Sequence, residues 1–324
     1  MSEDSPSEAS LIERIRRLFP RTGDDAAVIG NQVLTNDMLV EDVDFTREVP
    51  LRSIARKCIA ANVSDLAAMG ARPLYALVAV GAPEWVDVAV FLDELAAAAS
   101  LHGIEIVGGD LSTAGQLVVS VTAIGEAARP ILRRGARPGD RVYVSRPLGA
   151  SAAGLHLLRH GWRAADTPGA AAREIPEGIG YSEREFGASA IRRHLEPDPE
   201  VDLGLRLVGI ATACIDISDG LSTDLHHLCD ASGVGAEIVR ERIPLFPGLV
   251  GEGAALGIPV AESVLNGGEE YALLFTAKLR ESELSARVGR PVYAIGRITA
   301  DLGVRLDGQP LAAGGWDHFL RPVE

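Results

Sequence analysis

Hydrophobic positions along this chain alternate between helical spacing and short continuous runs, which is the pattern of a mixed α/β protein. Residues 51–69 carry apolar side chains three and four apart, whereas residues 74–80 form an unbroken apolar run. Helical spacing predicts helices over 10–19, 51–69, 86–100, 150–160, 188–194, 201–210 and from 221 onward. Apolar runs predict strands over 27–29, 33–35, 74–80, 104–107, 117–124, 141–145, 210–215, 236–243, 271–275 and 291–298.

A polar stretch rich in arginine, glycine and proline, residues 133–140, divides these elements into two groups. It predicts a domain boundary, with an N-terminal domain over 1–136 and a C-terminal domain over 137–324. The first group has an α+β order of helix, strands, helix, strand, helix and two strands, and the second is α/β. Residues 161–187 carry Pro, Gly and charge without periodicity, so we interpret them as a surface excursion.

Polar residues interrupt the apolar patterns at three places, and each interruption predicts a boundary. One strand is expected to end at residues 36–37 and another at residues 108–110, where two glycines allow close approach of a ligand. Residues 62–65 contain Asn, Ser and Asp in the middle of an apolar helical pattern. They predict a cap or a functional insertion within that helix.

Composition is that of an ordinary globular enzyme, with 324 residues, 47% hydrophobic and 23% charged. No apolar run approaches the roughly 20 residues that a membrane helix needs, and the acidic N-terminus does not predict a signal peptide. The three cysteines, Cys58, Cys214 and Cys229, form no CxxC pair and lie in apolar patterns. They predict buried, reduced thiols in a cytoplasmic protein.

The formal net charge of -14 argues against a nucleic-acid surface, which requires clustered Lys and Arg. It does not argue against anionic small molecules. An acidic protein that handles phosphate needs a cation such as Mg²⁺ to neutralise both partners.

The turn after the run 210–215 places two carboxylates close together. Asp216 ends the run, Asp219 follows within a Ser-Asp-Gly turn, and a helical pattern begins at Leu221. Carboxylates at a strand exit suit a hard cation, and free N–H groups at a helix start favour phosphate. Other carboxylates occupy similar positions in the chain: Asp24, Asp25, Asp37, Asp65, Asp110 and Glu269. Each alone is equally typical of a turn or a cap, so the pattern leaves metal binding and a structural role open.

The absence of several known catalytic motifs excludes or disfavours some classes of enzyme. A GxxxxGK[ST] loop and the protein-kinase signature are absent, which excludes those two kinase classes. The seven histidines form no HExxH motif, so zinc-dependent hydrolysis has little support.

Eight blocks, in order along nearly the whole chain, resemble the thiamine-monophosphate kinase family. They are GDDAAVI (23–29), TNDMLVE (35–41), NVSDLAAMGARP (62–73), VGGD (107–110), RRGARPGDRVYVS (133–145), DISDGLSTDLHHL (216–228), NGGEEYALLFT (266–276) and WDHF (316–319). That family belongs to the superfamily of aminoimidazole ribonucleotide synthetase and selenophosphate synthetase. The resemblance implies an N-terminal α/β domain whose sheet builds a homodimer, with a C-terminal α/β domain beside it.

The resemblance also implies an activity: transfer of the ATP γ-phosphoryl group to thiamine monophosphate, giving thiamine diphosphate. Several Mg²⁺ ions would be held by Asp25, Thr35, Asn36, Asp37, Asp65, Asp110, Asp216 and Asp219, with Asp65 as the bridging ligand. ATP would contact Gly109, Asp110, Arg133 and Ser218. Thiamine monophosphate would contact Glu269 and Trp316, and Asp44 occupies a further position at the substrate. For Trp316 the alternative of a C-terminal core anchor remains open. No histidine is nominated as a base, because the acceptor oxygen is already ionised near neutral pH.

The chain departs from the family pattern mainly around the acceptor. Asp44 stands where the family usually has His, and Glu270 and Ala272 replace Asp and Glu. Asn36 replaces a Thr or Ser ligand, although its amide oxygen can still coordinate a metal. Two alternatives therefore stay open: a superfamily enzyme with another acceptor, and a non-catalytic nucleotide-binding homologue. Selenophosphate synthetase is disfavoured, because the first cysteine is Cys58, inside a predicted helix.

Overall fold

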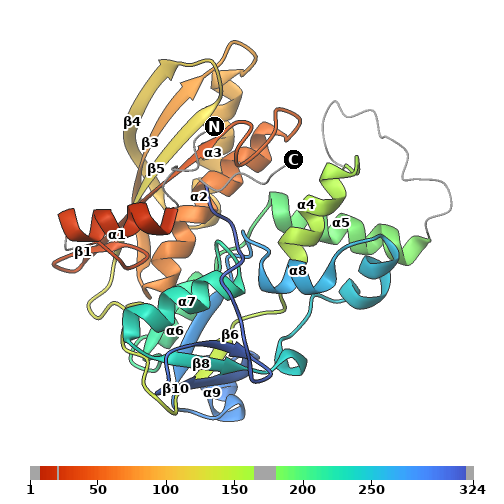
Figure 1. Ribbon diagram of the computed structural model, residues 1–324. Coiled ribbons are helices and arrows are strands. Elements are labelled where there is room, and N and C mark those ends of the chain that lie inside the picture. Colours follow the sequence, from red (N-terminus) through yellow and green to blue (C-terminus); the bar gives the residue numbers. More distant parts are fainter. Residues whose placement is uncertain (1–7, 20–21, 164–179, 319–324) are drawn as a thin grey trace.

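The computed structural model describes residues 8–19, 22–163 and 180–318. It contains two β-sheets, each with its own helices (Figure 1). The first sheet is built from the strands up to residue 126, and the second from the strands after residue 140. Of the predicted surface excursion, residues 164–179 lie outside the described residues, and its last part belongs to a helix.

Every predicted helix and strand has a counterpart, with ends shifted by one to several residues. The α-helices are α1 (Glu8–Leu18), α2 (Leu51–Ala68), α3 (Val88–Leu101), α4 (Ala150–Arg159), α5 (Tyr181–Leu195), α6 (Val201–Leu207), α7 (Leu221–Ser232), α8 (Val260–Leu265) and α9 (Glu281–Val288). The strands of the first sheet are β1 (Ala27–Ile29), β2 (Gln32–Val40), β3 (Arg72–Ala82), β4 (Glu105–Thr113) and β5 (Val118–Glu126). Those of the second are β6 (Arg141–Val144), β7 (Ala213–Asp216), β8 (Gly235–Ile238), β9 (Leu273–Ala277), β10 (Tyr293–Thr299), β11 (Gly303–Leu306) and β12 (Gln309–Pro310).

The first sheet has the strand order β1-β2-β5-β3-β4, in which β3 and β4 run parallel and the other neighbours antiparallel. Buried side chains alternate along β5, and Val119 and Val121 share a core with α2 and α3. These two helices lie on one side of the sheet (Figure 1). The other face exposes Met38, Tyr75 and Leu77.

Two predicted strand ends are wrong. β2 continues through residues 36–37 to Val40, and β4 continues through residues 108–110 to Thr113, because neighbouring strands supply partners for the whole length. The glycines inside β4 have a packing reason. A Cβ at Gly109, where φ is 157°, would lie 1.8 Å from the carbonyl oxygen of Val78.

Because side chains alternate along a strand, β2 divides the predicted metal ligands between two faces. Thr35 and Asp37 face α2, whereas Asn36 faces the opposite side. There its amide donates hydrogen bonds to Ser120 Oγ (3.1 Å) and Thr122 Oγ1 (2.8 Å) of β5.

The break predicted within α2 is also wrong, since the helix runs without interruption from Leu51 to Ala68. Its polar side chains are buried because they have partners elsewhere in the chain. Asn62 Oδ1 accepts a hydrogen bond from the Asp37 N–H (3.0 Å), and Ser64 Oγ donates to Asp216 Oδ2 (2.6 Å). Beyond the end of α2, Gly70 turns the chain with a φ of 61°.

The second sheet has the order β12-β11-β8-β10-β6-β9-β7 and is antiparallel except between β8 and β11. One of its faces shares a core with α4, α5 and α7, and the other packs against α6 and α9. The end of α2 joins this second core through Ala67 and Ala68. A Cβ on Gly204 of α6 would lie 2.1 Å from the Ala67 carbonyl oxygen, so α2 and α6 approach closely. α2 therefore links the two sheets.

The prediction that the three cysteines are buried and unpaired is confirmed. Cys58, Cys214 and Cys229 are free and buried, and burial raises the pKa of each thiol. In the described part of the chain, no helix is both long enough and apolar enough to cross a bilayer.

Candidate active site

Three segments meet at the start of α7: the turn 216–220, the loop 266–271 and residues 314–316. Backbone hydrogen bonds hold them together, because the Glu269 N–H donates to the Ser218 carbonyl (2.7 Å) and the Tyr271 N–H to the Ile217 carbonyl (2.9 Å). The Trp316 N–H donates to the carbonyl oxygen of Asp219 (3.1 Å). The predicted acidic turn thus has two other candidate segments as direct neighbours.

The loop 266–271 is conformationally strained. Glu269 and Tyr271 have φ values of 58° and 48°, in the left-handed region that costs residues with side chains about 1 kcal/mol or more. Gly268 permits the close contact, since a Cβ there would lie 2.5 Å from the Ser218 carbonyl oxygen. Such strain in a tightly packed loop is typical of functional sites.

Asp25, Asp65 and Asp216 form what we call the acidic cluster. They come from the segment before β1, from α2 and from the end of β7, and one carboxylate oxygen of each lies within 4.8 Å of the others. Ser64 donates a hydrogen bond to Asp216, and Thr35 Oγ1 donates to Asp65. The cluster therefore joins residues of both sheets.

Burial and mutual repulsion make these carboxylates difficult to ionise. Burial, followed by the charge of Asp25, raises the pKa of Asp216 to about 8. Burial, followed by Asp37 and Asp216, raises the pKa of Asp65 well above its usual value. Burial also raises the pKa of Asp25, although its partner Arg133 opposes this effect. Arg133 donates to Asp25 Oδ1 from Nε (2.9 Å) and Nη2 (2.6 Å).

The donor set fits a hard cation. Asp25 Oδ2 is buried and has no hydrogen-bond partner in the described part of the chain, although a buried carboxylate oxygen normally has one. Oxygen atoms from three carboxylates and the neighbouring Thr35 hydroxyl are ligands that Mg²⁺ prefers. Burial and the charge of Asp44 also raise the pKa of the adjacent Asp37 to about 6. A divalent ion would relieve these repulsions.

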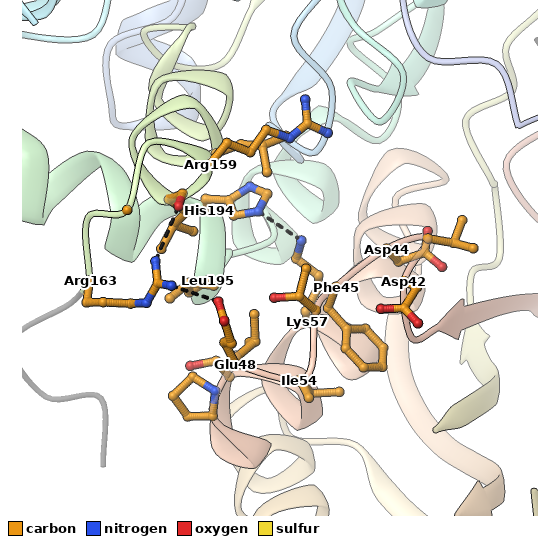
Figure 2. A pocket seen from close by; sticks show the side chains of 18 of the residues that line it. Asp42, Asp44, Phe45, Glu48, Ile54, Lys57, Arg159, Arg163, His194 and Leu195 are labelled. Carbon is orange, nitrogen blue, oxygen red and sulfur yellow. Dashed lines mark hydrogen bonds and ion pairs between the residues drawn. The ribbon is translucent and has the colours of Figure 1, made fainter. Parts of the chain in front are cut away.

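A cavity of about 620 Å³ lies beside the acidic cluster. Its walls come from residues 42–50, the first half of α2, α4 and the end of α5. Apolar side chains such as Phe45, Ile54 and Leu158 line much of it. Figure 2 shows Asp42 and Asp44 on one side of Lys57, with His194 and Arg159 on the other.

Lys57 is the centre of a buried polar network on the cavity wall. Its Nζ donates to both carboxylate oxygens of Glu269 (2.7 and 2.8 Å) and lies 3.4 Å from His194 Nε2. Burial alone would raise the pKa of Glu269, but Lys57 and His194 outweigh it and lower that pKa. Burial, followed by the charge of Lys57, lowers the pKa of His194 to about 3, so its ring is neutral. The neutral ring accepts from Lys57 at Nε2, and its Nδ1 lies 3.1 Å from Ser151 Oγ.

Two residues lie between the cavity and the cluster. Asp44 lines the cavity, and its negative charge raises the pKa of Asp37, beside the cluster. Tyr271 is 6% exposed, and the charges of Glu269, Asp37, Asp216 and Asp44 all act on its hydroxyl. The cavity and the cluster are therefore adjacent parts of one site.

Family models and known proteins match this chain along nearly its full length. The model for the N-terminal domain of AIR synthase related proteins matches residues 23–127, and that for the C-terminal domain matches residues 137–309. The thiamine-monophosphate kinase of Aquifex aeolicus (strain VF5) is 35% identical, over 96% of this chain and 98% of the relative. That of Mycobacterium tuberculosis (strain CDC 1551 / Oshkosh) is 37% identical, over 93% and 86%. The chain belongs to the thiamine-monophosphate kinase family.

A solved structure supports the same assignment. The complex of AaThiL with AMPPCP and TMP has a TM-score of 0.85 and 33% sequence identity, and the match covers 98% of this chain and 99% of that one. The predicted fold class, a two-domain mixed α/β architecture of AIR synthase related type, is confirmed.

The sequence blocks that resemble thiamine-monophosphate kinases are only partly brought together. Asp25, Asp65 and Asp216 lie together, Thr35 donates a hydrogen bond to Asp65, Asp37 acts on the pKa of Asp65, and Arg133 pairs with Asp25. Asp219 belongs to a neighbouring group with Asp224 and His227. Asn36 and Asp110 do not join the acidic cluster: Asn36 faces the other side of β2, and Asp110 lies in β4, separated from β2 by two strands.

Of the predicted substrate residues of this thiamine-monophosphate kinase family member, Asp44 lines the cavity, whereas Glu269 and Trp316 do not. Glu269 is held by Lys57. Trp316 is 42% exposed and contacts His318 edge-on, which contradicts the alternative of a core anchor. Among predicted ATP contacts, Ser218 lies in the turn before α7, and Gly109 lies in β4.

Sequence reasoning missed Lys57 and Tyr271. The sequence does contain an indication of the role of Lys57, because a lone lysine within the apolar face of a helix requires a buried partner. Tyr271 lies in the recognised block 266–276, but its position beside four carboxylates follows from strained loop geometry that no spacing rule supplies.

Proposed function

We propose that this protein transfers the γ-phosphoryl group of ATP to the phosphate of thiamine monophosphate, giving thiamine diphosphate. One observation carries the proposal: a buried acidic cluster poor in cations adjoins a cavity of about 620 Å³, in a full-length relative of thiamine-monophosphate kinases. The cavity volume is within the range typical of small-molecule sites. The AaThiL complex holds AMPPCP and TMP on the same fold.

Several Mg²⁺ ions belong to the proposal. Asp25, Asp65, Asp216, Asp37 and Thr35 would hold them, with Asp65 central because Thr35, Asp37 and Asp216 all act on its carboxylate. When bound, Mg²⁺ would neutralise phosphate charge and orient the phosphates. Asp219 is the further candidate ligand, beside the start of α7.

The protein's own groups would position the two substrates. The N–H groups at the start of α7, with Ser218 before them, favour the phosphates of ATP, and Arg133 adds a positive charge. The cavity would take the acceptor with its phosphate toward the acidic cluster, between Lys57 and Asp44. No general base is required, because a phosphate monoester oxygen is ionised near neutral pH. The neutral, buried His194 does not change this assignment.

A coupled assay tests the proposed function directly. The protein is incubated with ATP, Mg²⁺ and thiamine monophosphate, and thiamine diphosphate is followed by chromatography. We expect product only when all three are present. ATP binding without diphosphate would contradict the acceptor assignment and favour another acceptor or a nucleotide-binding role.

The domain division at residues 136 and 137, a cytoplasmic location and a homodimer are part of the same proposal. Two sheets and two matching family models support the division, and buried free thiols support a reducing compartment. Exposed Met38, Tyr75 and Leu77 on the uncovered face of the first sheet support pairing of two copies there.

A second copy would also account for Asp110. Three strand spacings of about 4.8 Å separate β2 from β4, so Asp110 lies about 14 Å from the β2 ligands of its own chain. It shares the uncovered face with Asn36, because its partner Ala79 pairs with Ser120. We therefore assign Asp110 and Gly109 to the site of the partner chain.

Mixing two inactive variants tests this assignment. Asp110→Asn and Asp65→Asn proteins are unfolded and refolded together in equal amounts. If Asp110 completes the partner's site, half of the dimers are mixed and each holds one intact site, so about a quarter of wild-type activity returns. Activity no higher than that of the separate variants would place both residues in one chain's site.

A further inference from the structure

The charges that line the cavity are unevenly compensated. Lys57 is paired with Glu269, and Arg163 with Glu48 (2.7 Å). Asp44 forms no ion pair with any described residue. The basic side chains that act on it, His318 and Lys57, are not within ion-pair distance. Two carboxylates of the cavity wall, Asp42 and Asp44, thus have no counter-ion among the described residues (Figure 2).

The position of the Asp44 carboxylate is fixed by the backbone. Its Oδ2 accepts a hydrogen bond from the Val40 N–H (2.7 Å), at the end of β2. The preceding turn contains Asp42 with φ of 66° and is closed by a hydrogen bond from the Asp42 N–H to the Phe45 carbonyl (2.8 Å). One oxygen of Asp44 is therefore used by the fold, and the other is available to a ligand.

The position of Asp44 relative to the acidic cluster determines which part of the acceptor lies next to its carboxylate. Asp44 acts on Asp37, beside the cluster, and it also lines the cavity. A ligand whose phosphate lies toward the cluster would present the group next to that phosphate to Asp44. In thiamine monophosphate this group is the thiazolium ring, which carries a permanent positive charge two carbons from the phosphate oxygen.

We propose that Asp44 selects acceptors with a cationic ring next to the phosphate, through the charge of its carboxylate. This inference rests on the proposed function for the identity of the acceptor. A half-buried pair of opposite charges at this kind of site contributes up to about tenfold in affinity. The preference should therefore be measurable against an uncharged ligand of the same shape.

The experiment compares thiamine monophosphate with its 3-deaza isostere, in which carbon replaces the thiazolium nitrogen and the ring is neutral. Wild type and Asp44→Asn are assayed with both monophosphates, and Asn keeps an oxygen for the Val40 N–H. We expect wild type to favour the cation by roughly tenfold in kcat/KM, mainly through KM, and the variant to bring the ratio close to one. An unchanged ratio in Asp44→Asn overturns the inference.

Asp42→Asn is the matched control, because Asp42 is a carboxylate of the same wall that already accepts a hydrogen bond from Gln116 (3.1 Å). It should keep the preference. Equal loss in both variants would assign the preference to the general charge of the wall and overturn the role of Asp44.

Calorimetric binding of the two monophosphates to wild type and Asp44→Asn separates this inference from the proposed function. If no diphosphate forms but wild type binds the cation more tightly, and the variant does not, the kinase assignment fails and the inference stands. If diphosphate forms and neither measurement shows a preference that depends on Asp44, the inference fails and the kinase assignment stands.

Discussion

The acidic cluster and the neighbouring cavity differ in how far their charged side chains have partners of opposite charge. In the cluster, Asp25 pairs with Arg133, Asp65 and Asp216 form no ion pair with a described residue, and burial raises the pKa of all three carboxylates. In the cavity, Lys57 is matched by Glu269, whose pKa is lowered. The Lys57–Glu269 pair is therefore balanced without a ligand, whereas the cluster has an excess of negative charge that an external cation would balance. Removing a charge should stabilise the first region and destabilise the second.

The largest expected effect is on the activity of Asp65→Asn. Loss of the central carboxylate should reduce turnover by at least about a thousandfold, because charge neutralisation supplies most of the catalysis. The same change should raise the free energy of unfolding without metal by about 1 kcal/mol, since it removes a buried, repelled carboxylate. Enzyme assays and thermal denaturation measure both. Wild-type turnover, or a large loss of stability, would contradict this account of the cluster.

Lys57→Met should have the opposite effect on stability. It leaves the half-buried carboxylate of Glu269 without its cation, which costs about 2 kcal/mol in the free energy of unfolding. The double variant Lys57→Met with Glu269→Gln should recover most of this loss, because no uncompensated charge remains. Urea denaturation of the two single variants and the double variant gives the coupling energy. Additive losses would show that the pair is not coupled.

His194 should give stability a dependence on pH. Its pKa is about 3 in the folded protein and about 6.5 in the unfolded chain, so between these values the unfolded chain binds more protons. The contribution of neutral His194 is therefore present above pH 6.5 and is lost as pH falls. Relative to His194→Asn, wild type should lose about 2 kcal/mol of stability between pH 7 and pH 5. Parallel curves of stability against pH for wild type and His194→Asn would contradict this role of His194.

Tyr271→Phe should show the smallest effect. The hydroxyl has no hydrogen-bond partner among the described residues, so its loss should change the free energy of unfolding by less than about 0.5 kcal/mol. It lies between the cluster and the cavity, where it could donate to a substrate phosphate, so kcat should fall about tenfold. A fall in stability with unchanged kcat would instead make Tyr271 a structural residue.

The sequence predicted most elements and much of the cluster, because apolar periodicity and carboxylates after apolar runs are local signals. It failed where a polar group has a distant partner. The polar residues Asn62 and Ser64 predict a helix break, but hydrogen bonds with Asp37 and Asp216 satisfy them inside a continuous helix. The side of the sheet that Asn36 faces follows from the two-residue period of a strand once the length of β2 is known. The pairing of Lys57 with Glu269, which are 212 residues apart, cannot be predicted from any local pattern.

The uninterrupted course of α2 fixes the distance between the two halves of the site. Lys57 and Asp65 are eight residues apart on one helix, a rise of about 12 Å. Lys57 on the cavity wall and Asp65 in the acidic cluster therefore cannot move independently along this axis. Adding one residue between them would turn Asp65 by about 100° and advance it by about 1.5 Å. If the proposed function holds, a change of acceptor size must be accommodated by the walls of the cavity, while the path from Lys57 to the proposed metal ligand Asp65 keeps its length.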